Sequence, residues 1–96
     1  MENISVINLE TLFAQESVID IVTFHAGLKN GIDYRMLDRK FVQYRFEVIA
    51  TGELLSTVNT LCREGIIQDE RGSMVFTKGS NWKEPLFSKE KKHGIK

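Results

Sequence analysis

Residues 51–79 read TGELLSTVNTLCREGIIQDERGSMVFTKG, and this stretch predicts one helix followed by a short β-hairpin. Apolar residues recur in its first half at the spacing of one helix face, which holds Leu54, Leu55, Val58, Leu61 and Cys62. We expect Thr51 to cap this helix, because its hydroxyl can accept from a free N–H of the first turn. Gly65 should end the helix, since glycine readily takes the left-handed conformation wanted there.

The second half of the stretch predicts two strands. Ile66 and Ile67 begin the first strand, the pair Arg71–Gly72 turns the chain, and residues 74–76 carry it back. The expected order is therefore helix, tight turn and hairpin.

This stretch resembles the second half of a winged helix-turn-helix domain, in which small transcription regulators often read STV…L…REG.I…G….T.KG. The matching residues are Ser56, Thr57, Val58, Leu61, Arg63, Glu64, Gly65, Ile67, Gly72, Thr77, Lys78 and Gly79. The resemblance implies a mostly α fold with a small β-hairpin (α+β), arranged as a winged-helix-like single domain. It also implies a DNA-binding transcription regulator, working as a homodimer on two half-sites. Winged helices serve as protein-binding modules too, so the motif specifies the fold better than the function.

The rest of the chain is predicted from local signals. Apolar residues within 3–7 predict a short strand against the hairpin, and Asn8 and Ser17 are both typical helix caps. Residues 9–29 therefore form either one helix or two abutting helices, which Asn30–Gly31 would terminate.

Asp33 predicts the start of a further helix, whose apolar face holds Met36, Leu37, Phe41, Tyr44, Val48 and Ile49. This helix should end at residues 50–52. A short strand at residues 46–49 is the alternative, because aromatic and β-branched residues cluster there.

The C-terminal part is predicted to leave the domain. Trp82 should pack under the hairpin or on the first helix, and Pro85 should mark the end of regular structure. Residues 1–87 then form the domain, and residues 88–96 form a flexible charged tail.

Composition favours a small cytoplasmic protein. The chain has 96 residues and one cysteine, which excludes an internal disulfide and a multi-cysteine zinc site. No apolar run approaches the roughly 20 residues that cross a bilayer, and the N-terminus lacks the basic region of a secretory signal. We therefore expect a cytoplasmic location and no membrane partner.

No catalytic constellation is visible in the sequence. His25 lies beside an apolar stripe, and His93 lies in the charged tail, where we expect it to be solvated. The glycine spacing matches no phosphate-binding loop. The sequence therefore predicts no enzyme, no metal and no cofactor.

A nucleic-acid interface can be assembled from three sets of side chains. The exposed helix face would meet base edges in the major groove through Ser56, Thr57, Asn59, Thr60 and Arg63. Arg71 would enter a minor groove from the hairpin tip, and Lys78 would meet a phosphate. The preceding helix would add backbone contacts through Arg35, Arg39 and Lys40.

The alternative is a protein-binding module. The 13 basic and 13 acidic residues give a formal net charge of zero, but residues 1–28 hold Glu2, Glu10, Glu16 and Asp20 without any lysine or arginine. An acidic patch of Glu10, Glu16 and Asp20 could attract a basic partner such as a nuclease toxin. The chain would then be an immunity protein, an antitoxin or a phage-encoded inhibitor.

Overall fold

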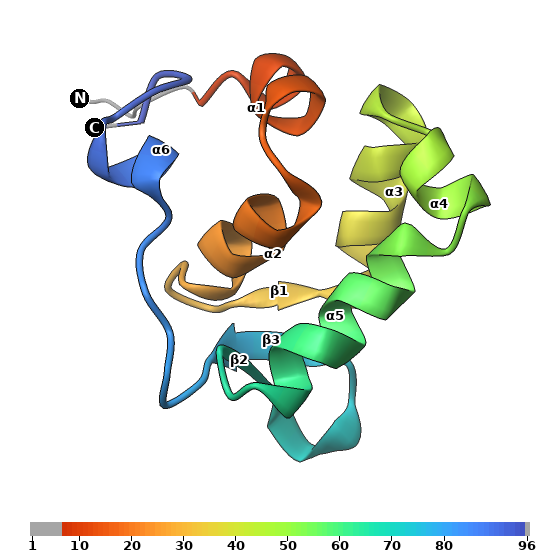
Figure 1. The fold of residues 1–96 in the computed structure, drawn as a ribbon, viewed down its shortest axis with the longest axis vertical. Coiled ribbons are helices and arrows are strands. Elements are labelled where there is room, and N and C mark those ends of the chain that lie inside the picture. The colour runs from red at the N-terminus through yellow and green to blue at the C-terminus, as the bar shows by residue number, and fades with distance from the viewer. Residues whose placement is uncertain (1–6, 96) are drawn as a thin grey trace.

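The computed structural model describes residues 7–95 and shows a mostly helical globule with one small antiparallel sheet (Figure 1), which confirms the predicted α+β class. The helices are α1 (Leu9–Gln15), α2 (Val18–Ala26), α3 (Tyr34–Tyr44), α4 (Glu47–Ala50), α5 (Glu53–Arg63) and α6 (Leu86–Lys89). The strands are β1 (Ile32–Asp33), β2 (Ile67–Asp69) and β3 (Val75–Lys78), with the 3-10 turn η1 (Glu70–Gly72) between β2 and β3.

Residues 9–29 form two helices, because each has its own cap. The Asn8 side chain accepts from the backbone N–H of Thr11 at 3.2 Å and begins α1. The Ser17 hydroxyl accepts from the N–H of Asp20 at 3.1 Å and begins α2. Between them Glu16 is extended, so the chain changes direction there.

The helix predicted from Asp33 is shorter than expected. Asp33 caps α3 as predicted, but α3 ends at Tyr44 because Arg45 leaves the helical conformation, with φ −158° and ψ 72°. The Arg45 guanidinium instead donates to the backbone carbonyls of Ala14 and Glu16, at 3.3 and 3.0 Å. These two bonds connect the end of α3 to the end of α1. The residues that they join are 31 and 29 positions apart in the sequence.

Residues 47–50 then form the short helix α4, so the strand considered for residues 46–49 is wrong. The clustered aromatic and β-branched residues there divide between two environments. Val48 is buried in the core, whereas Phe46 remains exposed to solvent. In a helix, side chains of one turn point to different sides, so Val48 faces the core while Phe46 faces solvent. The residue types alone did not indicate this helix.

The sheet has the order β1-β3-β2, and both pairs are antiparallel. Ile32 lies opposite Phe76 on one side of β3, and Gln68 lies opposite Thr77 on the other. The strand predicted within residues 3–7 lies outside the described residues, except for Ile7, which belongs to no strand. Within the described part, β1 is the strand that pairs with the hairpin.

The core lies where α2 packs against α5 and β3, with α1 and α3 closing the other side. Its largest fully buried side chains are Phe13, Phe41, Phe76, Leu12, Ile21, Leu37, Leu54, Leu61 and Ile67. Across residues 7–95, none of the helices has the length and apolar character needed to cross a membrane.

Trp82 packs between α2 and the hairpin. Its indole N–H donates to the Thr23 carbonyl at 2.8 Å, and the Lys78 ammonium lies 4.4 Å from the centre of its ring. The ring therefore lies next to the hairpin, as predicted, but it contacts α2 rather than the first helix.

Pro85 does not end regular structure, and residues 88–95 do not leave the globule. Pro85 is the residue before α6, and Phe87 of α6 is buried against Phe24, with ring centres 5.2 Å apart. Beyond α6 the chain runs beside α1 (Figure 1), where the Asn8 N–H donates to the His93 carbonyl at 2.8 Å. These contacts place residues 88–95 against the globule, where the sequence predicted a flexible charged tail.

Candidate nucleic-acid interface

Helix α5 starts without the predicted cap. Thr51 is not the cap residue of α5, and its hydroxyl donates backwards to the Glu47 carbonyl at 2.8 Å. Gly52 occupies the cap position with φ 78°, a left-handed conformation that favours glycine. Glu53 lies in the first turn, where its negative charge suits the positive end of the helix dipole.

Helix α5 ends as predicted. Gly65 has φ 76°, its N–H donates to the Cys62 carbonyl at 3.1 Å, and the N–H of Ile66 donates to the Leu61 carbonyl at 3.0 Å. This pair of bonds is the Schellman arrangement, which satisfies the free carbonyls of the last turn. The turn directs the chain straight into β2.

The inner face of α5 is fixed in the core through Leu54, Val58 and Leu61, all buried. Leu55 was predicted to be buried with them, but it is 47% exposed, because it falls at the edge of the apolar stripe. Cys62 is only half-buried. The outer face of α5 therefore starts at Leu55.

The outer face of α5 forms a shallow groove of about 440 Å³, lined by Gly52, Leu55, Ser56, Asn59, Thr60 and Arg63. Among the described residues that line it, Arg63 is the one cation, and the Arg63 guanidinium donates to the Thr60 hydroxyl at 3.4 Å. Thr57, predicted to belong to the same set, is half-buried and does not line the groove. The groove offers hydroxyl, amide and guanidinium groups, which can pair with base edges or phosphates.

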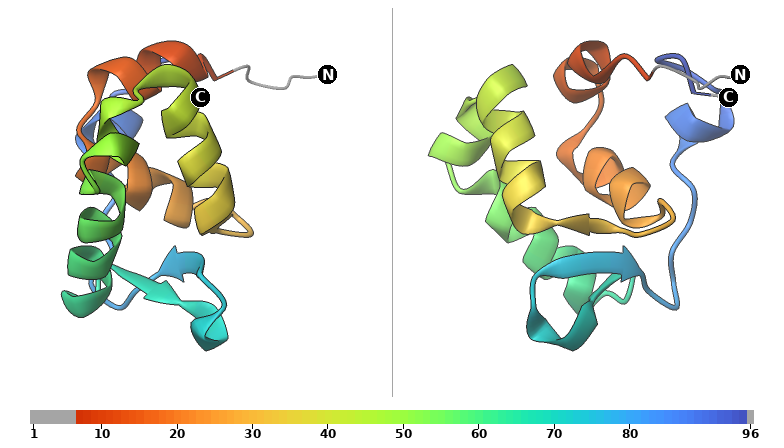
Figure 2. Two further views of the ribbon diagram at one scale, coloured as in Figure 1. Left: turned by 90° about the vertical axis from the view of Figure 1, so that its right-hand side faces the viewer. Right: turned by 180° about the vertical axis from the view of Figure 1, so that it is seen from behind.

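The hairpin reverses over residues 70–74, a longer turn than the predicted Arg71–Gly72 pair. Arg71 and Met74 both take left-handed conformations, with φ 59° and 61°. The Asp69 carboxylate accepts from the Met74 N–H at 2.7 Å and closes the turn. Figure 2 shows this reversal projecting from the end of the molecule opposite α1 and α6. Arg71 is therefore exposed at the tip, as predicted.

The remaining predicted cations lie away from the α5 groove. Lys78 is held over Trp82 and borders a separate hollow at the end of α2. Arg35 and Arg39 are exposed on α3, whereas Lys40 is half-buried and lines a cavity between α1, α2 and α3. The structure thus brings together Ser56, Asn59, Thr60 and Arg63 on one face of α5. The other four predicted cations, Lys78, Arg35, Arg39 and Lys40, do not lie there.

The predicted acidic patch is divided by an internal contact. The Glu16 carboxylate accepts from His93 Nε2 at 2.6 Å, and the Glu16 and His93 side chains are only 18% and 6% exposed. The sequence predicted a solvated His93, and this prediction is wrong. Glu10 stays exposed on α1, while Asp20 is half-buried on α2. Glu16 is consequently unavailable to a partner unless this contact breaks.

A second groove was not predicted from the sequence. It measures about 760 Å³ and lies between α2, the end of α5 and the segment 80–86, where Trp82 forms part of the wall. Ile19 and Leu86 line it and are 53% and 64% exposed. In the sequence, this groove was indicated by Ile19, an apolar residue that lies outside the apolar stripe of α2. Leu86, which lines the same groove, lies far along the chain from Ile19.

Among the described side chains, no group of three or more His, Cys, Asp and Glu residues could hold a metal ion. Burial, and secondarily the charge of Asp69, raise the pKa of the Cys62 thiol, so the thiolate needed for nucleophilic attack is disfavoured.

Comparisons with protein-family models, curated proteins and solved structures find no match for this chain.

Proposed function

We propose that this chain is a winged-helix DNA-binding protein that acts as a transcription regulator. In this proposal α5 enters a major groove and the hairpin tip reaches the neighbouring minor groove. The observation that carries it is the α5 groove, where Ser56, Asn59, Thr60 and Arg63 share one exposed face. The opposite face of α5 is anchored in the core, so these side chains have a rigid base.

The element order also supports the proposal. Helix α5 is followed directly by the hairpin, which is the order that the resemblance to winged-helix regulators implies for residues 51–79. The third strand of the sheet, β1, pairs with β3 and comes from the stretch between α2 and α3. The hairpin lies directly after α5, so Arg71 and the α5 groove could contact one duplex together.

The charge of the surface indicates weak phosphate binding. Arg63 and Arg71 are the cations at the α5 groove and the hairpin tip, Arg35 and Arg39 on α3 would add contacts to the DNA backbone, and Glu53 and Glu64 at the two ends of α5 are both exposed. Each neutralised phosphate contributes about −0.9 to the slope of log K against log salt, so a single chain should show a shallow slope. A homodimer on two half-sites would double it and provide the missing affinity.

The test is binding to genomic DNA fragments over a series of salt concentrations. We expect binding at low salt, with Arg63→Ala reducing the discrimination between preferred and random sequences. Arg35→Ala removes an equal charge outside the α5 groove and should weaken binding uniformly across sequences. Absence of binding to any fragment at low salt would remove the proposal.

The groove between α2 and segment 80–86 favours a second candidate, a protein-binding immunity protein, antitoxin or inhibitor. Its exposed Ile19 and Leu86 lie beside three acidic residues and one basic residue, namely Asp20, Glu64, Glu84 and Lys83. An apolar centre with a charged rim is the usual composition of a protein interface. We expect a basic partner to co-purify from the native host in fixed stoichiometry. The double change Ile19→Asp and Leu86→Asp should abolish that association, whereas Arg63→Ala should leave it unchanged.

A further inference from the structure

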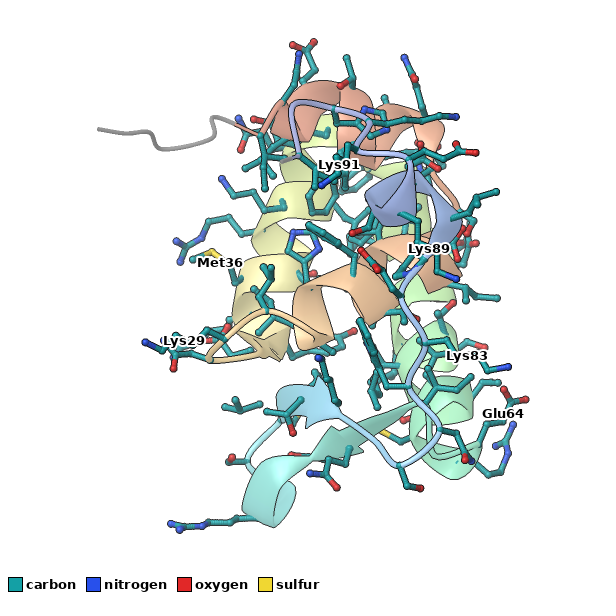
Figure 3. All side chains as sticks on the ribbon, turned by 90° about the vertical axis from the view of Figure 1, so that its left-hand side faces the viewer. Lys29, Met36, Glu64, Lys83, Lys89 and Lys91 are labelled. Atoms are coloured by element: carbon teal, nitrogen blue, oxygen red, sulfur yellow. The ribbon has the colours of Figure 1, made fainter. Side chains whose placement is uncertain are left out.

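The groove between α2 and segment 80–86 combines apolar side chains with charged ones. Its apolar side chains are Ile19, Ile66, Trp82, Pro85 and Leu86. Ile19 and Leu86 are exposed, whereas the other three are buried or half-buried. An aliphatic side chain that packs against Ile19 and Leu86 would therefore remove apolar area from water on both partners, which favours binding. Figure 3 shows Glu64 and Lys83 of this groove on one side of the molecule, opposite Lys29 and Met36.

The charged residues that line this groove are mostly acidic. Among the described lining residues, Asp20, Glu64 and Glu84 are negative and Lys83 alone is positive, so the lining carries a net negative charge. The Glu84 carboxylate accepts from the Ser88 hydroxyl at 2.6 Å. No hydrogen bond or ion pair within the described part of the chain involves the side-chain carboxylate of Asp20 or Glu64. Both carboxylates are therefore free to bind a guanidinium or ammonium group.

The rim of the groove also has free backbone groups. Residues 82–85 belong to no helix or strand. Within the described residues, no hydrogen bond uses the backbone N–H of Lys83 or of Glu84. An extended peptide can pair its carbonyl oxygens with free N–H groups of this kind. Its side chains then alternate, so every second side chain points towards the groove.

We propose that this groove binds an extended basic peptide segment, in which an aliphatic side chain is flanked two residues away on each side by arginine or lysine. The aliphatic side chain packs against Ile19 and Leu86, and the basic side chains bind the carboxylates of Asp20 and Glu64. This inference rests on the second candidate function and deepens it, because it names the part of a partner protein that the groove recognises. It does not depend on DNA binding, since neither the exposed face of α5 nor the hairpin tip lines this groove.

Trp82 supplies the measurement, because it is the only tryptophan of the chain and lines the groove. The probe is the end-capped peptide Arg-Ala-Leu-Ala-Arg, which is titrated into the full chain while the fluorescence of Trp82 is recorded. We expect saturable binding below about 1 mM at low salt, weakening as the salt concentration rises.

Three control peptides separate the contributions of charge, apolar contact and spacing. A peptide with glutamate in place of both arginines should bind at least about tenfold more weakly, because it meets acids of its own sign. A peptide with alanine in place of leucine should bind about tenfold more weakly, because it loses apolar contact. The rearranged peptide Ala-Arg-Leu-Arg-Ala has the same composition but places its arginines on the opposite face, and should bind roughly threefold more weakly.

A pair of double variants tests the location. Asp20→Asn with Glu64→Gln should weaken the arginine peptide at least about tenfold, whereas Glu10→Gln with Glu53→Gln removes equal charge outside the groove and should leave its affinity unchanged. Equal binding of the arginine and glutamate peptides, no saturable binding, or an unchanged affinity in the first double variant would overturn the proposal. Failure of the peptides while a basic protein still co-purifies would overturn this inference and leave the second candidate function standing.

Discussion

Replacing Glu16 with glutamine should loosen the C-terminal segment from α1. The Glu16 carboxylate accepts from His93 Nε2 at 2.6 Å and joins residues 77 positions apart. His93 Nδ1 lies 2.9 Å from the Thr11 hydroxyl, and its backbone carbonyl accepts from the Asn8 N–H. The imidazole is thus bound on both nitrogens, and Glu16 supplies the only carboxylate that contacts it in the described part of the chain.

The cost can be worked from this geometry. A hydrogen bond to a charged group contributes about 1.5–3 kcal/mol, and the low exposure of His93 limits screening by water. We expect His93→Ala to lower the free energy of unfolding by about 2 kcal/mol, and Glu16→Gln to lower it by about 1 kcal/mol, because the glutamine amide oxygen can still accept from Nε2 but carries no charge. For a domain of this size, about 2 kcal/mol corresponds to a fall of about 8–16 °C in Tm. Because both changes act on one contact, the double variant should lose little more than His93→Ala alone.

Urea denaturation of the parent and the three variants would measure this coupling. Glu10→Gln is the matched control, because Glu10 is exposed on the same helix and its loss should change stability by less than about 0.5 kcal/mol. Strictly additive losses in the double variant would refute the reasoning. A Glu16→Gln variant as stable as the control would refute it equally.

Three further predictions concern stability. Burial lowers the pKa of His25 below its ordinary 6.5, so the unfolded chain binds a proton at His25 more tightly than the folded chain does. The contribution of the neutral, buried His25 to stability is therefore full above pH 6.5 and is lost as the pH falls below that value. The urea midpoint should therefore fall on acidification, and less so in His25→Phe. Val58→Asp buries an unpaired charge at a 2% exposed position and should cost several kcal/mol, measured by the same denaturation. Gly31→Ala should cost more than about 1 kcal/mol, because Gly31 has φ 66° and a Cβ there would lie 2.2 Å from the Phe76 carbonyl oxygen; a thermal melt equal to that of the parent would contradict this.

Much of the fold was predictable because its signals are local. Asn8, Ser17 and Asp33 each cap a helix through a bond to the backbone three residues ahead, and Gly65 ends α5 at the expected position. Periodicity within α5 likewise predicted its outer face. Each of these features is set by neighbours within one or two helical turns.

The failed predictions depended on contacts across the chain. α3 ends early at Arg45, whose guanidinium binds carbonyls at the end of α1, and no local pattern encodes that bond. The C-terminal segment looked like a tail because its charges lacked visible partners. In the structure, Lys91 takes the left-handed position after α6, with φ 56°, where a glycine would have signalled a helix end.

The candidate site was predictable only in part. The polar face of α5 follows from sequence period, but the two cavities depend on how α2 packs against other elements, namely α1 and α3 on one side and residues 80–86 on the other. Sequence period cannot place such segments together. The burial of His25 likewise depends on how α2 packs against α1, since its ring lies 5.3 Å from that of Phe13.

An NMR titration of the full chain with a duplex from its own genome, at low salt, tests DNA recognition by α5 most directly. We expect the largest amide shift changes on residues 55–63 of α5 and on residues 69–74 of the hairpin. Raising the salt concentration should reverse them. Shift changes confined to Ile19 and residues 80–86, or none at excess DNA, would contradict it.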